Sequence, residues 1–401
     1  MNLIGLIGKP NVGKSTFFNA ATEFSVPTAN YPFTTISPNI GQAAVRVKCV
    51  CREFGVIDNP VHSVCIDGNR FIPVKLLDVA GLVPGAYRGR GLGNKFLDDA
   101  RQTNALIHVV DVSGSTDSEG KVVSPGIGDP LSDIASVDKE FDLWLASILT
   151  KEWNKVQREE GREEQRTEEI LARRLSGLGV AVTEIKESIT ELNLANKKLV
   201  GWSETDITDF CKKIRMRTKP MVIAANKIDS ENAYENILKI KKERSAVIPC
   251  GAEAESVLRR ASKKGLIEYL PGDKHFQIKS NAALNDIQKR ALTRISDLIQ
   301  KYGSTGIQDA INYAVFDLLK LVVVYPVEDD VRLADKNGNV LPEARLMEYG
   351  STIKDLAKSV HTDLSEGLLY GIDVRSGRRL SVDYVLKNND VVKIVSTSRK
   401  G

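Results

Sequence analysis

The feature that most limits how this chain can fold is a glycine-rich segment near its N-terminus. An apolar run at positions 3–7 leads into the sequence GKPNVGKST at positions 8–16, and a helical pattern follows to position 21. Gly8 and Gly13, followed by Lys14 and Ser15, fit the phosphate-binding loop that joins a strand to a helix. Backbone N–H groups of such a loop turn toward phosphate oxygens, and the helix adds the positive end of its dipole. The chain therefore opens with the pattern of a mononucleotide-binding α/β fold.

This pattern assigns individual roles. Lys14 reaches the β- and γ-phosphates as a catalytic charge, and the Ser15 hydroxyl binds Mg²⁺. The residues expected to contact the nucleotide in this segment are Asn11, Val12, Gly13, Lys14, Ser15 and Thr16.

Four more apolar runs read as buried strands, at positions 74–79, 105–112, 221–225 and 246–248. Near-continuous hydrophobicity without alternation is typical of parallel strands covered by helices on both faces. Strands separated by helical stretches predict an α/β fold with a doubly wound, mostly parallel sheet. About a hundred residues separate the second and third of these runs, so this stretch is expected to hold a helical insertion. Within it, positions 157–169 are strongly charged. They form either a solvated helical face or hairpin tip, or a coiled coil that docks a partner.

Three further motifs end predicted strands. Asp78 can hold Mg²⁺ through water, and the Gly81 N–H can face the γ-phosphate as a catalytic group. Asp229 can accept hydrogen bonds from both guanine N1–H and N2–H₂, a donor pair that adenine lacks. Two residues before it, the Lys227 stem can stack over the base.

Asn226 is expected to contact the N7 side of guanine and to brace the phosphate loop. After the last buried strand come Gly251 and Ala252, whose backbone N–H is placed to meet guanine O6.

Together these residues resemble the P-loop GTPases. NYPFTT at positions 30–35 is similar to the first switch of the Obg-type GTPases, and DVAGLVPGA from position 78, with GLGNKFL from position 91, is similar to their second switch. The likeness is greatest to the YchF-related branch and its archaeal members. It includes the helical insertion and a C-terminal β-grasp module that looks like a TGS domain.

The resemblance implies four parts: a first GTPase segment at 1–119, the insertion at 120–215, a second GTPase segment with trailing helices at 216–318, and the TGS-like domain at 319–401. Positions 256–319 read as mostly helical, with a loop around positions 271–272. In the C-terminal module, Asn337 and Gly338 predict a hairpin turn between two short strands. Thr352 and Asp355 predict a capping box for a helix at 353–361.

The resemblance also implies hydrolysis of GTP to GDP and association with the ribosome or RNA. Thr35 is the expected second Mg²⁺ ligand and a catalytic residue, with Thr34 as the alternative. Leu82 stands where many GTPases carry a glutamine that orients the attacking water. Asn11 resembles an asparagine of K⁺-activated relatives, although it could simply tighten the loop.

Two other functions stay open. One is ATP hydrolysis, because the best-known YchF proteins have a degraded guanine motif and resemble ATPases. In this chain Asn226, Lys227 and Asp229 are intact, which favours GTP. The other is a nucleotide-gated ribosome-binding factor whose turnover is incidental.

A cysteine-rich segment offers a separate possibility. Cys49, Cys51, His62 and Cys65 could supply four Zn²⁺ ligands, or they could be reduced, partly buried thiols beside a surface histidine.

Composition narrows the class of protein. The net charge of +4 is too small to establish nucleic-acid binding by itself. Neither a membrane-spanning run nor a signal peptide is recognisable. Five cysteines are an odd number, which favours a reducing cytoplasm over a disulfide framework. We expect a cytoplasmic monomer that binds GTP and GDP.

Overall fold

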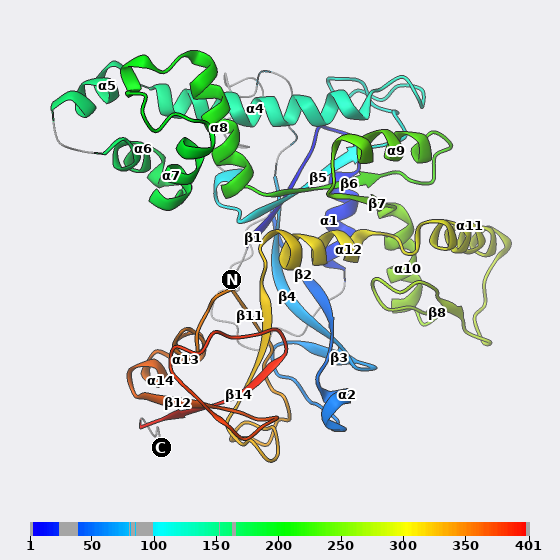
Figure 1. Ribbon diagram of the computed structural model, residues 1–401. Helices are drawn as coiled ribbons and strands as arrows, with labels where there is room; N and C mark the ends of the chain where they lie inside the picture. Colours follow the sequence, from blue (N-terminus) through cyan, green and yellow to red (C-terminus); the bar gives the residue numbers. More distant parts are fainter. Residues whose placement is uncertain are drawn as a thin grey trace. The chain divides into compact units, whose positions relative to one another are not determined.

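The structure is a computed structural model that describes residues 3–23, 39–79, 81, 85, 99–151, 153–162 and 166–397. The chain divides into two compact units. The first comprises Met1–Ala20 and Leu76–Ala310, and the second comprises Ala21–Lys75 and Ile311–Gly401. Figure 1 shows the elements of both units, which are described separately below.

A parallel sheet forms the centre of the first unit. Its strands are β1 (Leu3–Ile7), β5 (Ala105–Asp111), β6 (Met221–Asn226) and β7 (Val247–Cys250). β5 lies between β1 and β6, and β6 pairs with β7, all in parallel. Every residue of β5 is buried, as expected for a strand with both faces covered. The predicted mostly parallel α/β sheet is confirmed.

The complete sheet has seven strands in the order β2-β4-β1-β5-β6-β7, with β3 paired to β4. The additional strands are β2 (Ile40–Lys48), β3 (Val64–Ile66) and β4 (Asn69–Asp78). β3 and β4 run antiparallel. β4 ends at Asp78, the residue predicted to hold Mg²⁺.

Helices follow several of the parallel strands. α1 follows the phosphate loop, α9 and α10 follow β6 and β7, and α11 and α12 come later in the chain. Their bounds are Lys14–Thr22, Ala233–Glu243, Ala252–Lys263, Asp286–Tyr302 and Ile307–Tyr313. Ile237 and Ile240 of α9 join the core that lies against β5 and β6. A short hairpin, β8 (Ile267–Glu268) with β9 (Gln277–Ile278), interrupts a stretch that the sequence predicted as helix and loop.

The insertion is helical, as predicted. α4 (Pro130–Thr150) is capped at its N-terminus by Asp129, whose side chain accepts a hydrogen bond from the Leu131 N–H. Four shorter helices gather at one end of α4 in Figure 1: α5 (Trp153–Arg162), α6 (Thr167–Leu175), α7 (Val182–Glu191) and α8 (Glu204–Thr218). Arg215 of α8 pairs with Asp142 of α4 at 2.6 Å and with Asp138 at 3.0 Å. No helix in the described ranges is both long and apolar enough to cross a membrane.

A five-stranded sheet with one packed helix forms the C-terminal part of the second unit. The strand order is β11-β10-β14-β12-β13. The strands are β10 (Val322–Val327), β11 (Arg345–Met347), β12 (Leu368–Asp373), β13 (Arg379–Leu380) and β14 (Asp390–Ser396). α13 (Ile353–Val360) packs Ile353 and Leu356 onto the sheet, and the short α14 (Thr362–Glu366) follows. Thr352 and Asp355 form the predicted capping box. The β-grasp prediction is confirmed.

The predicted hairpin around Gly338 is wrong in one respect. The turn is present, with Gly338 at a φ of 82°, but isolated bridges replace its two strands. Leu333 and Leu341 have φ values of 56° and 45°, a left-handed conformation that extended strands cannot contain. The Asp335 carboxylate also accepts from the N–H of Asn339, which folds the segment into a turn.

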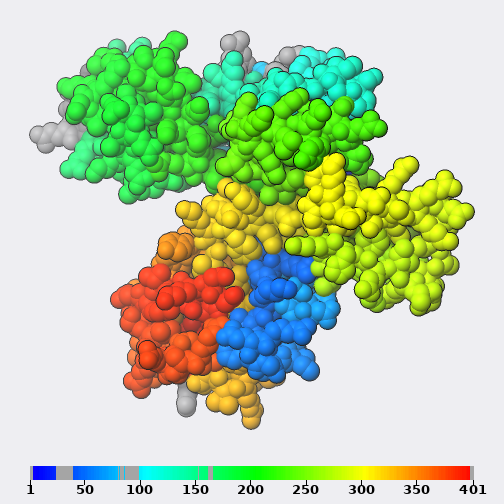
Figure 2. Space-filling model, turned by 45° about the vertical axis from the view of Figure 1, so that its right-hand side comes forward, coloured from blue at the N-terminus to red at the C-terminus, as the bar shows by residue number. Residues whose placement is uncertain are grey.

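The second unit contains an N-terminal segment that the sequence did not associate with the C-terminal module. Figure 2 shows the blue segment beside the red C-terminal residues. Arg375 binds both carboxylate oxygens of Glu53, at 2.5 and 2.7 Å. The N–H and carbonyl of Arg46 bond to the Asn312 side chain at 3.0 and 2.9 Å. Residues 40–75 and 311–397 therefore pack as one body.

Candidate nucleotide-binding site

The phosphate loop joins β1 to α1, as the sequence predicted, and two of its glycines are required by the packing. Gly8 has a φ of 152°, and a Cβ there would lie 2.5 Å from the Val109 carbonyl oxygen. Gly13 has a φ of 92°, and a Cβ there would lie 2.3 Å from Asn226 Nδ2. Only glycine allows this close approach. The loop is therefore held against the ends of β5 and β6.

Lys14, Ser15 and Asp78 lie together at one end of β1 and β4. The Lys14 ammonium forms an ion pair with the Asp78 carboxylate. The Ser15 hydroxyl donates to the other oxygen of that carboxylate at 3.3 Å. A Cβ on Gly81 would lie 3.2 Å from Pro10, so this glycine lies beside the phosphate loop. Residues that the sequence placed in two separate motifs thus form one cluster of charge and hydroxyl groups.

Asn226 connects three parts of the site. It ends β6 and is buried. Its amide nitrogen donates to the Val12 carbonyl at 2.9 Å, and its side-chain oxygen accepts from the Ala252 N–H at 3.1 Å. The first contact is the brace of the phosphate loop that the sequence predicted. The second engages the Ala252 N–H, whose expected contact with guanine O6 stays a prediction.

Lys227 and Asp229 follow β6. Lys227 has a φ of 68°, and its ammonium donates to the Asp111 carboxylate and to the Ser115 hydroxyl, each at 2.9 Å. These bonds anchor the end of the Lys227 side chain, and its stacking over the base stays a prediction. Asp229 is exposed at its expected place two residues later.

Asp111 belongs to the site, although no motif in the sequence indicated it. It ends β5 and is buried. Ser113, Ser115 and Thr116 all donate hydroxyl hydrogen bonds to its carboxylate, beside Lys227. Burial alone would raise the pKa of Asp111, but these hydrogen bonds and the lysine charge hold it below its usual value. The sequence did contain a pattern that could have indicated this role: an aspartate at the end of a buried strand, followed by a serine-rich turn.

The segment after Asp111, residues 113–128, lies over the phosphate loop. The buried Lys9 ammonium donates to the carbonyls of Thr116 and Asp117 at 3.0 and 2.7 Å and pairs with Asp133 at 2.6 Å. The Asn11 amide donates to the Gly120 carbonyl at 2.9 Å. These bonds hold the phosphate loop in place. The sequence suggested a loop-tightening role for Asn11 but none for Lys9.

A buried polar network supports Gly251. The Gly251 N–H donates to the Thr305 carbonyl at 2.9 Å. The Thr305 hydroxyl donates to Glu255, which also accepts from Arg259 at 2.5 Å and from the Tyr269 hydroxyl at 2.6 Å. A charge this deeply buried is tolerated when it is paired and hydrogen-bonded. The turn that starts α10 is thereby fixed in position.

Thr34, Thr35 and Leu82 fall outside the described residues, so their predicted roles stay predictions. Val12 is buried, while Ser15 is exposed and Thr16 is half-buried in the first turn of α1.

The predicted zinc set is wrong in its fourth member. Cys49, Cys51 and Cys65 lie together, but the fourth group beside them is the carboxylate of Asp58. His62 points elsewhere and pairs with Glu343. The spacing of a histidine three residues before a cysteine suggested a shared site, yet the chain between β2 and β3 turns so that Asp58 faces the thiols.

Three family models match the chain. Residues 3–227 match the 50S ribosome-binding GTPase model, residues 224–329 match the G4 motif-containing domain of Obg-like GTPase YGR210-like proteins, and residues 337–396 match the TGS domain. Together they account for nearly the whole chain in the order that the motifs indicated.

The relatives agree with these models. A GTP-binding protein of Methanocaldococcus jannaschii, MJ1332, is 49% identical over all of both chains. A GTP-binding protein of Schizosaccharomyces pombe, C428.15, is 37% identical, covering 89% of this chain and 90% of its own. The ribosome-binding ATPase YchF of Bacillus subtilis is 33% identical, covering 63% of this chain and 66% of its own.

A solved structure shares the fold. The crystal structure of a GTP-binding protein from Pyrococcus horikoshii OT3 is 41% identical, with a TM-score of 0.77, covering 99% of this chain and all of its own. The chain therefore belongs to the Obg-like, YchF-related P-loop GTPases that carry a TGS domain.

Proposed function

We propose that the protein binds GTP and hydrolyses it to GDP and phosphate, acting as a molecular switch. The observation that carries this proposal is the position of Asn226, which bonds at once to the phosphate loop at Val12 and to the Ala252 turn. These two bonds link the strand end that carries the guanine motif to the loop that binds the phosphates. Asp229, exposed at the edge of the same site, supplies the carboxylate that selects guanine.

Magnesium fits the oxygen donors of this site. Ser15 Oγ lies 3.3 Å from Asp78 Oδ2, and hydroxyl and carboxylate oxygens are the ligands that Mg²⁺ prefers. Ser15 and Asp78, with Thr35, would hold the ion. When bound, the ion supplies positive charge to the phosphoryl group that is transferred. Thr35 and the segment after Asp78 would be the two switch regions that the γ-phosphate orders.

The protein's own side chains and backbone groups position and stabilise the phosphates. Lys14 places a fixed charge toward the β- and γ-phosphates, and the backbone N–H groups of the loop and of Gly81 orient the phosphate oxygens. Leu82 cannot hydrogen-bond to a water, so hydrolysis proceeds without a glutamine at that position. The bond from the Asn11 amide nitrogen to the Gly120 carbonyl supports a loop-tightening role, while the amide oxygen, the atom that would bind K⁺, takes no part in it.

A second function, ATP hydrolysis, has support from relatives that are named ribosome-binding ATPases. The intact Asn226, Lys227 and Asp229 favour GTP, because adenine offers no donor pair to Asp229. Affinities for GTP, GDP and ATP, measured side by side on the full chain, test this choice. Tighter binding of ATP than of GTP would overturn the GTPase proposal.

We further propose that the protein acts on the ribosome in the cytoplasm, as a monomer, through the TGS domain and the helical insertion. The 50S ribosome-binding family model and the names of the YchF relatives support this partner. Co-sedimentation with ribosomes in GTP, in GDP and without nucleotide is the test. Equal binding in all three states would contradict nucleotide gating, both for the proposed switch and for a nucleotide-gated binding factor.

A further inference from the structure

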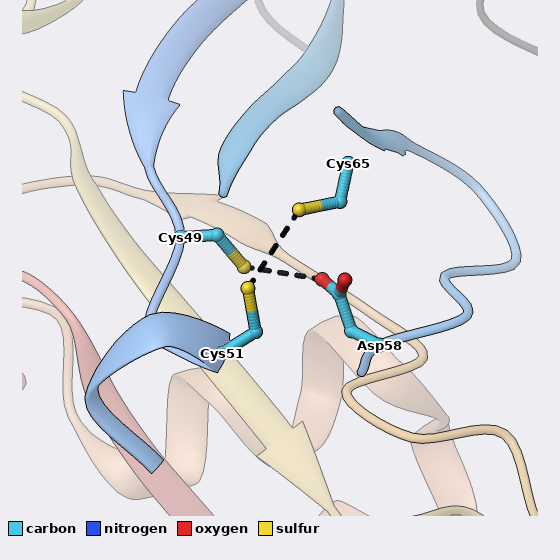
Figure 3. Close-up of side chains that lie close together, drawn as sticks. All are labelled: Cys49, Cys51, Asp58 and Cys65. Atoms are coloured by element: carbon cyan, nitrogen blue, oxygen red, sulfur yellow. Dashed lines mark hydrogen bonds between the residues drawn. The ribbon is translucent and has the colours of Figure 1, made fainter. Parts of the chain in front are cut away.

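Four side chains of the second unit converge on one point. Cys49 follows β2, Cys51 begins α2 (Cys51–Phe54), Asp58 lies in the next loop and Cys65 lies in β3. Their three sulfur atoms and one carboxylate oxygen all lie within 4.8 Å of one another. Figure 3 shows the four side chains pointing toward a common centre from these separate pieces of backbone.

The distances suit a tetrahedral metal centre. Cys51 Sγ and Cys65 Sγ are 3.8 Å apart, and Cys49 Sγ and Asp58 Oδ2 are 3.2 Å apart. Zinc binds thiolate sulfur at about 2.3 Å, so two sulfurs at neighbouring corners of a tetrahedron lie about 3.8 Å apart. The two measured pairs share no atom and therefore correspond to opposite edges of such a tetrahedron.

The surroundings are those of a closed structural site. Cys49 and Cys51 are each 5% exposed, the Asp58 side chain is 8% exposed, and Cys65 is half-buried. Four protein ligands leave no corner for substrate, which distinguishes structural from catalytic zinc sites.

A buried arginine orients the carboxylate. Arg70 Nη2 donates to Asp58 Oδ2 at 2.9 Å and to the Leu341 carbonyl at 3.0 Å, and Nη1 donates to the Ser63 hydroxyl at 2.8 Å. Three thiolates and a carboxylate exceed the charge of one divalent ion by two, and the adjacent guanidinium offsets part of that excess. Hydrogen bonds from outer groups to ligating carboxylates are a regular feature of metal sites.

We propose that Cys49, Cys51, Asp58 and Cys65 bind a structural Zn²⁺ ion. The ion cross-links the end of β2, the start of α2, the following loop and strand β3 into one rigid segment, called the knuckle below. Through Arg70 and Leu341, the knuckle connects to the residues that precede β11, so the ion also stabilises the packing of residues 40–75 on the C-terminal residues.

Metal analysis of the full-length protein, purified without chelator or metal-affinity resin, tests the proposal. We expect about one zinc per chain, released when the thiols are titrated with a mercurial reagent. Asp58→Asn keeps an acceptor for Arg70 but removes the anionic ligand, and Cys65→Ser removes a thiolate. Both variants should lose the metal.

Two matched controls should keep it. His62→Ala removes the histidine that pairs with Glu343, and Cys211→Ala removes a buried cysteine of α8 that lies outside the cluster. Loss of zinc in His62→Ala together with retention in Asp58→Asn would overturn the proposed ligand set.

Cobalt spectroscopy on the unmodified chain does not depend on how the variants fold. Co²⁺ added to reduced, zinc-stripped protein should give tetrahedral d–d bands and a charge-transfer intensity typical of three thiolates. Asp58→Cys should raise that charge-transfer intensity by about one third, because four thiolates rather than three would then bind the ion. Absence of zinc together with absence of this spectrum, or a Cys51–Cys65 disulfide in protein prepared without oxygen, would overturn the site.

Discussion

The side-chain amide of Asn226 donates a hydrogen bond to the backbone carbonyl of Val12 at 2.9 Å, although 214 positions separate the two residues. Asn226 ends β6 and Val12 lies in the loop after β1, and β5 lies between those strands. The carboxyl ends of parallel strands meet at one edge of a sheet, which brings the two motifs together. The motif proposed to recognise the base and the loop proposed to bind the phosphates are therefore joined directly by this hydrogen bond.

Replacement of Asn226 by alanine should weaken nucleotide binding without unfolding the chain. The variant loses the bonds to Val12 and Ala252, each worth about 1 kcal/mol, so affinity for GTP should fall about 30-fold. Titration with GTP and GDP measures this loss. Asn236→Ala is the matched control, because Asn236 donates to the Val112 carbonyl at 3.0 Å, at the end of β5, and has no predicted contact with nucleotide. An equal loss in both variants would contradict a special role for Asn226.

Asp229→Asn should remove the preference for guanine. The carboxylate accepts two hydrogen bonds from guanine, whereas an amide offers one acceptor and one mismatched donor. The loss should be about 2–4 kcal/mol, or about 30- to 1000-fold in GTP affinity, with little change for ATP. Parallel titrations of GTP and ATP measure it. Unchanged GTP affinity would show that Asp229 does not read the base, and ATP would become the leading substrate.

Lys14→Ala should abolish turnover in a folded protein. It removes the charge that balances the β- and γ-phosphates, and we expect the hydrolysis rate to fall by about 100-fold or more. Phosphate release measures turnover, and circular dichroism measures folding. Lys186→Ala, an exposed lysine of α7, is the control and should behave as the unmodified chain. Normal hydrolysis in folded Lys14→Ala protein would contradict the assignment of the phosphate loop.

His108 should make the fold sensitive to mild acid. It lies in β5, and burial lowers its pKa to about 4, although Asp138 nearby opposes the shift. The unfolded chain takes up the proton near pH 6.5, whereas the folded chain does not, so stability falls as the pH drops from about 6.5 toward 4. The loss should reach about 2 kcal/mol at about pH 5.

Denaturant unfolding at several pH values, compared with His108→Leu, isolates this contribution. The free energy of unfolding of the unmodified chain should fall faster than that of the variant between about pH 7 and pH 5. Parallel pH profiles for the two proteins would mean that His108 takes up its proton equally in both states.

Local patterns in the sequence determined much of the site. Gly8, Gly13 and Lys14 specify the phosphate loop because the backbone conformation and the ligands of that loop come from adjacent residues. Thr352 and Asp355 specify the start of α13 for the same reason. The apolar runs that became β1, β5 and β6 needed only their composition and order to indicate a parallel sheet.

Tertiary structure decided which distant groups meet. Asp111 became the anchor of Lys227 only because β5 and β6 are neighbours, and Asp58 rather than His62 joined the cysteines because of how the chain turns between β2 and β3. The packing of residues 40–75 on the C-terminal residues likewise depends on side chains far apart in sequence, such as Glu53 and Arg375. A residue's type fixes which bonds it can form. Its partner is fixed by the packing of the whole chain, since burying a polar group is favourable only where the fold supplies a matching one.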